Sequence, residues 1–295
     1  MATIASAPTI WGPYTSYSGN PIITSPSNTS LFQTVGHADL FEDGAGAWWA
    51  CALATRVVGS SFPIGRESTL IPVDWSGDWP VADLRPLDVP PEDAIKPKPS
   101  VSEADWNDLL QPPRHRLLHL RNPVRSRYNI TDTSVTLTPA PVPLTAPLGL
   151  PTFLAVRQRD LRFECEATFS IPHTAGVRTG LAVLNDHERF FAATVTAKDV
   201  SLTSATNHTP FPGSLEGAEK VTLRIRGTPE TYTFDLTKGA GDDADRTWER
   251  LGEGATKELN GGFMGAVIAL FAECDEDRVG TETKVRVTSW RYREL

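Results

Sequence analysis

Two stretches near the N-terminus decide the fold: Val35-Gly36-His37-Ala38-Asp39-Leu40 and Phe62-Pro63-Ile64-Gly65-Arg66-Glu67-Ser68-Thr69-Leu70-Ile71-Pro72-Val73-Asp74-Trp75. Between them, residues 47–58 are almost all apolar or small, which indicates a buried strand. The Glu-Asp-Gly-Ala-Gly run at 42–46 is a hairpin turn signal. We expect a second strand at 69–73 and a further turn at 76–78. Residues 1–85 are therefore predicted to consist of strands and turns.

From residue 116 to the C-terminus the sequence predicts many short strands separated by Gly, Pro and Asn. Residues 221–226 and 285–290 alternate apolar and polar side chains, which places one face of each strand inward and the other outward. Repeated short strands without intervening helices favour a β-sandwich. The strands that we expect are 134–138, 161–170, 180–184, 190–197, 220–226, 232–236, 264–272 and 284–292.

The region between these two parts is rich in proline. Seven prolines within residues 86–114 exclude a regular sheet there, and residues 86–100 are expected to form a stiff linker. A cap-like Ser102-Glu103-Ala104-Asp105 predicts a short helix through Leu110. We therefore divide the chain into residues 1–85, a linker with a short helix at 86–114, and a β-sandwich at 115–295.

Composition limits the classes of function. The chain has 295 residues, a net charge of −8 and no clear stripe of Lys and Arg, so we expect no nucleic-acid partner. The longest apolar run is too short to span a bilayer, and no membrane association is expected. The first residues lack the features of a secretory signal, which favours a cytoplasmic protein, or a secreted one if the start is truncated. The three cysteines show no disulfide or metal spacing, and each is expected to be a buried small side chain.

The ordered motifs resemble glycoside hydrolase family 43, the β-xylosidases and α-L-arabinofuranosidases. The two opening stretches, with Trp48-Trp49 and Asp78-Trp79-Pro80-Val81, look like the last blade of that family's β-propeller. Leu120-Arg121-Asn122-Pro123, the strand at 153–158 and Gly262-Phe263-Met264-Gly265 look like its C-terminal sandwich. The fold class implied is all-β, a concanavalin-like β-sandwich (jelly roll) preceded by a partial β-propeller blade segment.

The resemblance also implies a site. Family members hydrolyse xylosides or arabinosides with inversion, which needs two carboxylates. By resemblance these lie on blades that would precede residue 1, so no catalytic residue is assignable. By resemblance, His37 matches a histidine near the propeller axis that holds a water or calcium beneath the sugar. Arg66 matches an arginine that reaches the sugar. Phe263 matches an aromatic residue of the sandwich that contributes to the sugar pocket.

For each of these residues a structural role stays open: a core or turn position for His37, a local ion pair or the surface for Arg66, and the sandwich edge for Phe263. Trp48, Trp49 and Trp75 are expected either to contact a sugar or to fill a core. Trp48 and Trp49 would point to opposite faces of a strand. Asp39, Glu42, Glu67, Asp74 and Asp78 are expected to be solvated turn carboxylates rather than a replacement acid and base.

We predict a family 43-like protein that lacks the catalytic carboxylates and that binds a saccharide, or instead a small apolar ligand, rather than hydrolysing it. The alternatives are a fragment of a xylosidase or arabinofuranosidase, and an enzyme of secondary metabolism that uses a cleft between the blade segment and the sandwich. We predict no cofactor and no metal, with calcium left open. Because an isolated blade exposes an apolar face and edges, we expect it to dock on the sandwich or to pair in a homodimer.

Overall fold

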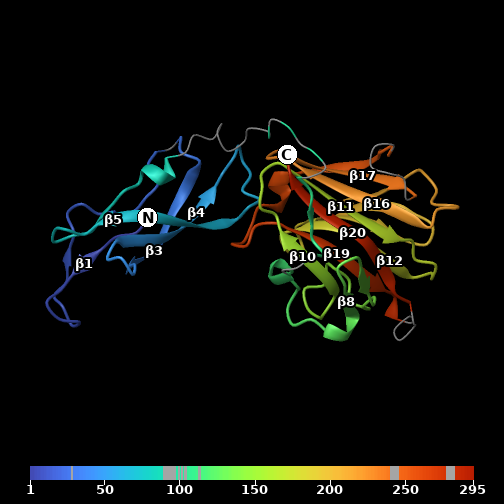
Figure 1. Ribbon diagram of the computed structural model, residues 1–295, viewed down its shortest axis with the longest axis horizontal. Helices are drawn as coiled ribbons and strands as arrows, with labels where there is room; N and C mark the ends of the chain where they lie inside the picture. Colours follow the sequence, from blue (N-terminus) through green and yellow to red (C-terminus); the bar gives the residue numbers. More distant parts are fainter. Residues whose placement is uncertain are drawn as a thin grey trace. The chain divides into compact units, whose positions relative to one another are not determined.

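The computed structural model of the protein describes residues 1–27, 29–88, 98, 100, 102, 105–111, 114–239, 246–276 and 283–295 (Figure 1). The chain divides into two compact units, Met1–Lys96 and Pro97–Leu295, which are described separately. The division falls inside the predicted linker at 86–114. Among the described residues no helix is long and apolar enough to cross a membrane.

The first unit is built on one antiparallel sheet of four strands in the order β3-β4-β5-β6. A turn at residues 43–47 joins the first two strands, and the Asp43 carboxylate accepts hydrogen bonds from the backbone N–H groups of Ala45 and Ala47 at 2.8 and 3.0 Å. A separate two-stranded ribbon, β1-β2, precedes the sheet. The elements are β1 (Ala5–Ser6), β2 (Thr15–Ser16), β3 (Phe32–Glu42), β4 (Trp48–Arg56), β5 (Arg66–Asp74), β6 (Val81–Ala82) and the 3₁₀ helix η1 (Arg85–Leu87).

Only one face of this sheet is buried. Ala50, Ala52 and Ala54 of β4 point into a small core with Val35 and Ile71. Cys51 points to the other face and is exposed, so the predicted strand is buried on one face and the expectation of a buried Cys51 is wrong. Successive side chains of a strand point to opposite faces. Small and apolar residues therefore occupy both faces of β4, but only one of these faces is covered by the core.

The second unit is a sandwich of two antiparallel sheets. One has six strands in the order β10-β19-β12-β13-β14-β15, and the other has the order β18-β17-β16-β11-β20-β9-β8, with β7 also paired to β20. The strands of the six-stranded sheet are β10 (Thr152–Arg157), β12 (Val177–Leu184), β13 (Phe190–Val195), β14 (Val200–Ser204), β15 (His208–Pro210) and β19 (Val267–Cys274). Those of the other sheet are β7 (Asn107–Asp108), β8 (Tyr128–Ile130), β9 (Val135–Leu137), β11 (Phe163–Ser170), β16 (Lys220–Gly227), β17 (Thr231–Lys238), β18 (Glu249–Ala255) and β20 (Val285–Glu294). Among the described residues of this unit, 3₁₀ helices lie at η3 (Arg114–Arg116), η4 (Arg125–Arg127) and η6 (Thr256–Leu259).

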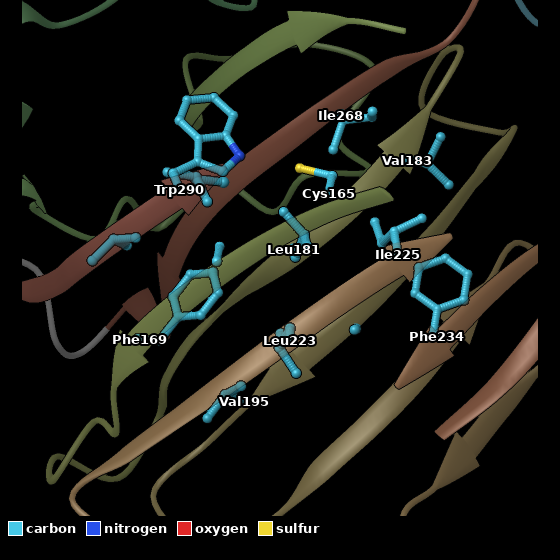
Figure 2. Packing of buried hydrophobic residues seen from close by; sticks show 14 of the residues in the cluster. Cys165, Phe169, Leu181, Val183, Val195, Leu223, Ile225, Phe234, Ile268 and Trp290 are labelled. Atoms are coloured by element: carbon cyan, nitrogen blue, oxygen red, sulfur yellow. The ribbon is translucent and has the colours of Figure 1, made fainter. Parts of the chain in front are cut away.

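The main core lies between the two sheets. Figure 2 shows Leu181, Val183 and Ile268 of the six-stranded sheet beside Cys165 and Ile225 of the other. Cys165 and Cys274 are buried, as expected. A second cluster, which includes Phe153, Phe190 and Phe271, lies on the outer face of the six-stranded sheet under Leu144. The expectations of an all-β fold and of a β-sandwich at the C-terminal side are confirmed.

The outer face of the eight-stranded sheet is charged. Glu164, Glu166 and Asp235 are buried and ion-paired to arginines on neighbouring strands. Burial raises the pKa of Glu166, while the hydrogen bond from Arg291 acts in the opposite direction. The strands β16 and β20 of this sheet follow the inward apolar, outward polar alternation that residues 221–226 and 285–290 predict.

The segment before the sandwich differs from the prediction. Asn107–Asp108 form β7 and pair with β20, and the Leu109 N–H donates to the Trp290 carbonyl at 2.8 Å. The predicted helix through Leu110 is therefore wrong over residues 107–110, because pairing with β20 outweighs the local helix signal. Residues 103 and 104 of that prediction lie outside the described residues, as do 89–97 of the linker.

Candidate functional site

His37 lies at an irregularity in the pairing of β3 with β4. Gly36 pairs with Leu53 and Asp39 with Cys51, so His37 and Ala38 together face the single residue Ala52. This is a β-bulge, a feature that bends a strand and redirects a side chain. The φ angle of His37 is 50°, in the left-handed region that few residues other than glycine adopt. The exposed imidazole is thus turned out of the regular ladder.

Arg66 is placed by the turn before β5. The Gly65 N–H donates to the Phe62 carbonyl at 3.0 Å, and Gly65 has a φ of 72°. Arg66 then begins β5 and pairs in register with Thr55 near the end of β4. Its exposed guanidinium is held at one end of the sheet by a backbone conformation that glycine supplies at low cost.

His37 and Arg66 line the same hollow, which has a volume of about 180 Å³. Its other walls come from β3 and β4 and from Met1, whose backbone lies against Gly36. A Cβ at Gly36 would lie 2.6 Å from the Met1 nitrogen, so the close approach requires glycine. The structure therefore brings together His37 and Arg66, two of the residues that the sequence singled out in this unit.

No carboxylate joins them among the described residues that line the hollow. Glu67 is ion-paired to Arg56, with Arg56 Nε 2.6 Å from Glu67 Oε1. The Asp74 carboxylate accepts the Ser76 N–H at 2.9 Å, and hydrogen bonds from Ser76 lower the pKa of Asp74. Asp39, Glu42 and Asp78 are exposed. Within the parts of the chain that the structure describes, no group of three His, Cys, Asp or Glu side chains could hold a metal ion.

The tryptophans lie elsewhere in the same unit. Trp48, Trp49 and Trp75 line a second, more open hollow of about 470 Å³ at the opposite end of β4 and β5. The rings of Trp48 and Trp75 meet edge to face with centroids 4.5 Å apart, and Trp49 Nε1 donates to Asp43 Oδ2 at 2.9 Å. Trp48 packs on the core of the unit, and Trp49 follows it on the strand, on the other face. Contact of these rings with a sugar stays a prediction.

Phe263 belongs to the sandwich unit. It follows Gly262, whose φ is 58°, in a turn between η6 and β19, and its side chain is 67% exposed. The Asn185 side-chain amide holds this turn by donating to the Gly261 carbonyl at 2.9 Å. Phe263 is thus not a core residue of the sandwich edge, and its part in a sugar pocket stays a prediction.

Comparison with known proteins identifies the family. Residues 113–293 match the model described as the beta xylosidase C-terminal concanavalin A-like domain, and residues 1–80 match glycosyl hydrolases family 43. The chain belongs to glycosyl hydrolase family 43. The resemblance that the sequence motifs indicated therefore holds for both units.

Curated relatives and solved structures agree with this membership. The chain is 27% identical over 292 residues to the non-reducing end alpha-L-arabinofuranosidase BoGH43B of Bacteroides ovatus, covering 89% of this chain and 52% of that protein. It is 25% identical over 280 residues to a xylosidase/arabinosidase of Butyrivibrio fibrisolvens, covering 81% and 48%. The solved structure of BlXynB from Bacillus licheniformis superposes with a TM-score of 0.80 at 20% identity, over 99% of this chain and 60% of that one. The chain thus spans about half the length of the curated relatives it matches.

The sequence did not predict all of the residues that line the hollow. Thr34 and Thr55 carry no motif, and only the register of β3, β4 and β5 places them beside His37 and Arg66. The available signal was the Gly36-His37 pair, since glycine within a strand often marks a bulge or a close backbone approach.

Proposed function

We propose that the first unit of this chain carries one wall of a saccharide-binding site, in which His37 and Arg66 contact the sugar. The observation that carries this proposal is that both side chains line one hollow, one of them turned there by a bulge. Arginine suits a sugar because its planar group donates several hydrogen bonds in fixed directions and stays charged. Backbone held in the left-handed region by a residue other than glycine is concentrated at functional sites.

The ligand class follows from the family. The curated relatives are named as an arabinofuranosidase and a xylosidase/arabinosidase, so we propose a pentose or a short pentose oligomer for this chain. The two threonines in the walls add hydroxyl groups that both donate and accept hydrogen bonds, which matches the hydroxyls of a sugar.

We propose further that the chain by itself binds this saccharide without hydrolysing it. Inverting hydrolysis needs an acid and a base about 6.5–9.5 Å apart on either side of the bond. Among the described residues that line the hollow there is no Asp or Glu, and the neighbouring Glu67 is engaged by Arg56. The support for this proposal is the chemistry of the wall, which offers donors but no carboxylate.

A second candidate is that this chain forms part of a hydrolase whose acid and base stand on a segment outside this sequence. Its support is that the relatives are named as hydrolases and that the chain covers 52% and 48% of their lengths. In this case His37 and Arg66 would hold the sugar while other residues break the bond.

Titration of the purified chain with xylobiose and with arabinose, followed by calorimetry, tests the binding. Arg66→Ala is expected to weaken binding about tenfold or more, the effect of removing a charged hydrogen-bond donor. His37→Gly should weaken binding while keeping or raising the melting temperature, because glycine adopts a φ of 50° without strain. Arg85→Ala is the matched control, since Arg85 is an exposed arginine of the same unit that pairs with Asp83.

Release of nitrophenol from nitrophenyl xyloside and nitrophenyl arabinoside separates the two candidates. Binding without release supports the binding role. Release that disappears in Arg66→Ala shows that the chain itself hydrolyses and overturns the binding-only proposal. Absence of binding to both sugars, or equal binding by Arg66→Ala and Arg85→Ala, overturns the site.

A further inference from the structure

The sandwich unit has a pocket of about 300 Å³ at the edge where its two sheets meet. On one side lies β10, the edge strand of the six-stranded sheet. On the other lies Leu109, directly after β7, with its N–H bonded to the Trp290 carbonyl of β20. Leu118 is held beside β10 by two hydrogen bonds with the backbone of Ala155, at 2.7 and 2.9 Å. The pocket is therefore framed by backbone that is fixed on both sides.

The inner lining is apolar. Val156 is only 6% exposed and belongs to the core between the sheets, and Leu109 packs on that same core. Leu118 is more exposed and forms a third apolar side. A ligand that enters here would bury apolar surface against the end of the sandwich core, which is favourable in proportion to the area covered.

The remaining lining residues are all basic: His115, Arg116, Arg157 and Arg159. Arg159 lies over the ring of Tyr292, 4.9 Å from its centroid, and Arg157 donates a hydrogen bond to the Met264 carbonyl. Both interactions fix the direction of a guanidinium. Among the described residues, no Asp or Glu lines the pocket, and neither Arg116 nor Arg159 forms an ion pair.

This gathering of cations contrasts with the rest of the protein. The chain has a net charge of −8, and on the outer face of the eight-stranded sheet arginines alternate with Glu164, Glu166 and Asp235. Cations around an apolar cavity repel one another, and an anion among them would remove that repulsion. Pockets for small molecules typically combine an apolar lining with a few directed polar groups.

We propose that this pocket binds a small organic anion that has an apolar body, with its carboxylate between Arg116 and Arg159 and its body against Leu109 and Val156. Guanidinium groups suit this role because they stay charged and match a carboxylate with two parallel hydrogen bonds. The pocket lies wholly in the sandwich unit. This proposal does not depend on the proposed saccharide site at His37 and Arg66.

Calorimetric titration with trans-cinnamate tests the proposal, with cinnamyl alcohol as the uncharged analogue and inorganic phosphate as the anion without an apolar body. Cinnamate is expected to bind at one site, more tightly than either other probe by about tenfold, and more weakly at high salt. Arg116→Gln and Arg159→Gln should each weaken cinnamate binding by about the same factor. Leu118→Glu should abolish it, because a carboxylate at the mouth repels the probe.

Arg286→Gln is the control, since Arg286 is an exposed arginine of β20 outside the pocket lining and the substitution changes the net charge equally. Far-ultraviolet circular dichroism and the melting temperature check that each variant is folded. Equal affinity for cinnamate and cinnamyl alcohol overturns the proposal, as does the same loss in Arg286→Gln as in Arg116→Gln. Failure of cinnamate to bind the wild-type chain also overturns it, and none of these results bears on sugar binding by Arg66.

Discussion

In the sandwich, each of two sheets gives one face to a shared core, whereas the single sheet of the first unit covers one face and leaves the other open. Between the sandwich sheets, side chains such as Leu223 and Phe234 are fully buried. On the open face of the first sheet, Phe41 is 41% exposed and Leu70 is 54% exposed. Register pairs Phe41 with Trp49 and Leu70 with Cys51, so these four side chains share that face.

The two units therefore differ in how far they cover their apolar side chains with residues of their own. The sandwich supplies both partners of its core from one stretch of chain, so its apolar residues are satisfied internally. The first sheet carries apolar residues on two faces, and its own unit covers one of them. A contiguous exposed apolar patch usually marks a surface that another element covers. The expected docking of this segment on the sandwich, or its pairing with a second copy, stays a prediction.

Truncating one leucine in each unit should give the largest difference in unfolding free energy between the two units. Leu223→Ala removes a fully buried side chain between the sheets and is expected to cost about 2–5 kcal/mol of unfolding free energy, through lost burial and a residual cavity. Leu70→Ala should change it by no more than about 0.5 kcal/mol, because its side chain is half exposed. Urea unfolding followed by tryptophan fluorescence and circular dichroism measures both. A cost for Leu70→Ala equal to that of Leu223→Ala would mean that the open face is covered in solution.

Glycine substitutions should give a smaller contrast. A Cβ at Gly254 of β18 would lie 2.2 Å from Cε1 of Phe191, a side chain buried in the sandwich core, so Gly254→Ala should cost about 1–3 kcal/mol by overpacking. Gly44, in the turn after β3, has nothing within 4 Å of the corresponding position. Gly44→Ala should therefore leave the melting temperature nearly unchanged. Similar losses in the two variants would contradict the packing described for β18.

Much of the fold could be predicted because its patterns are local. The alternation in residues 221–226 and 285–290 is the alternation of β16 and β20, and the turn signal at 42–46 lies where β3 gives way to β4. The strand β18 escaped prediction because Gly252 and Gly254 replace the apolar residues that alternation requires. They are glycines because Leu202 and Phe191 of the opposite sheet fill the space where a Cβ would be. Such a choice depends on a distant partner, which no local pattern records.

The candidate site was predictable only in part, for a similar reason. Motifs singled out His37 and Arg66, but their meeting in one hollow depends on a bulge that adds one residue to β3 between Gly36 and Asp39. Without that extra residue, the side chains beyond it would change faces. The pocket around Arg116 and Arg159 had no sequence signal, because its cations are spread over two segments that only the pairing of Leu118 with Ala155 brings together.

Thiol reactivity gives the smallest and most direct contrast between the two units. Cys51 is exposed on the open face of the first sheet, while Cys165 and Cys274 are buried in the sandwich, where burial raises the pKa of each thiol. The thiolate is the reactive form, so burial and a raised pKa both disfavour reaction at Cys165 and Cys274, while Cys51 is exposed to the reagent. A disulfide reagent that releases a coloured thiol should therefore titrate one cysteine in the native protein and three in denaturant, and Cys51→Ser should abolish the native reaction. Native reaction that persists in Cys51→Ser would place Cys165 or Cys274 within reach of solvent, and the sandwich core could not then be closed as described.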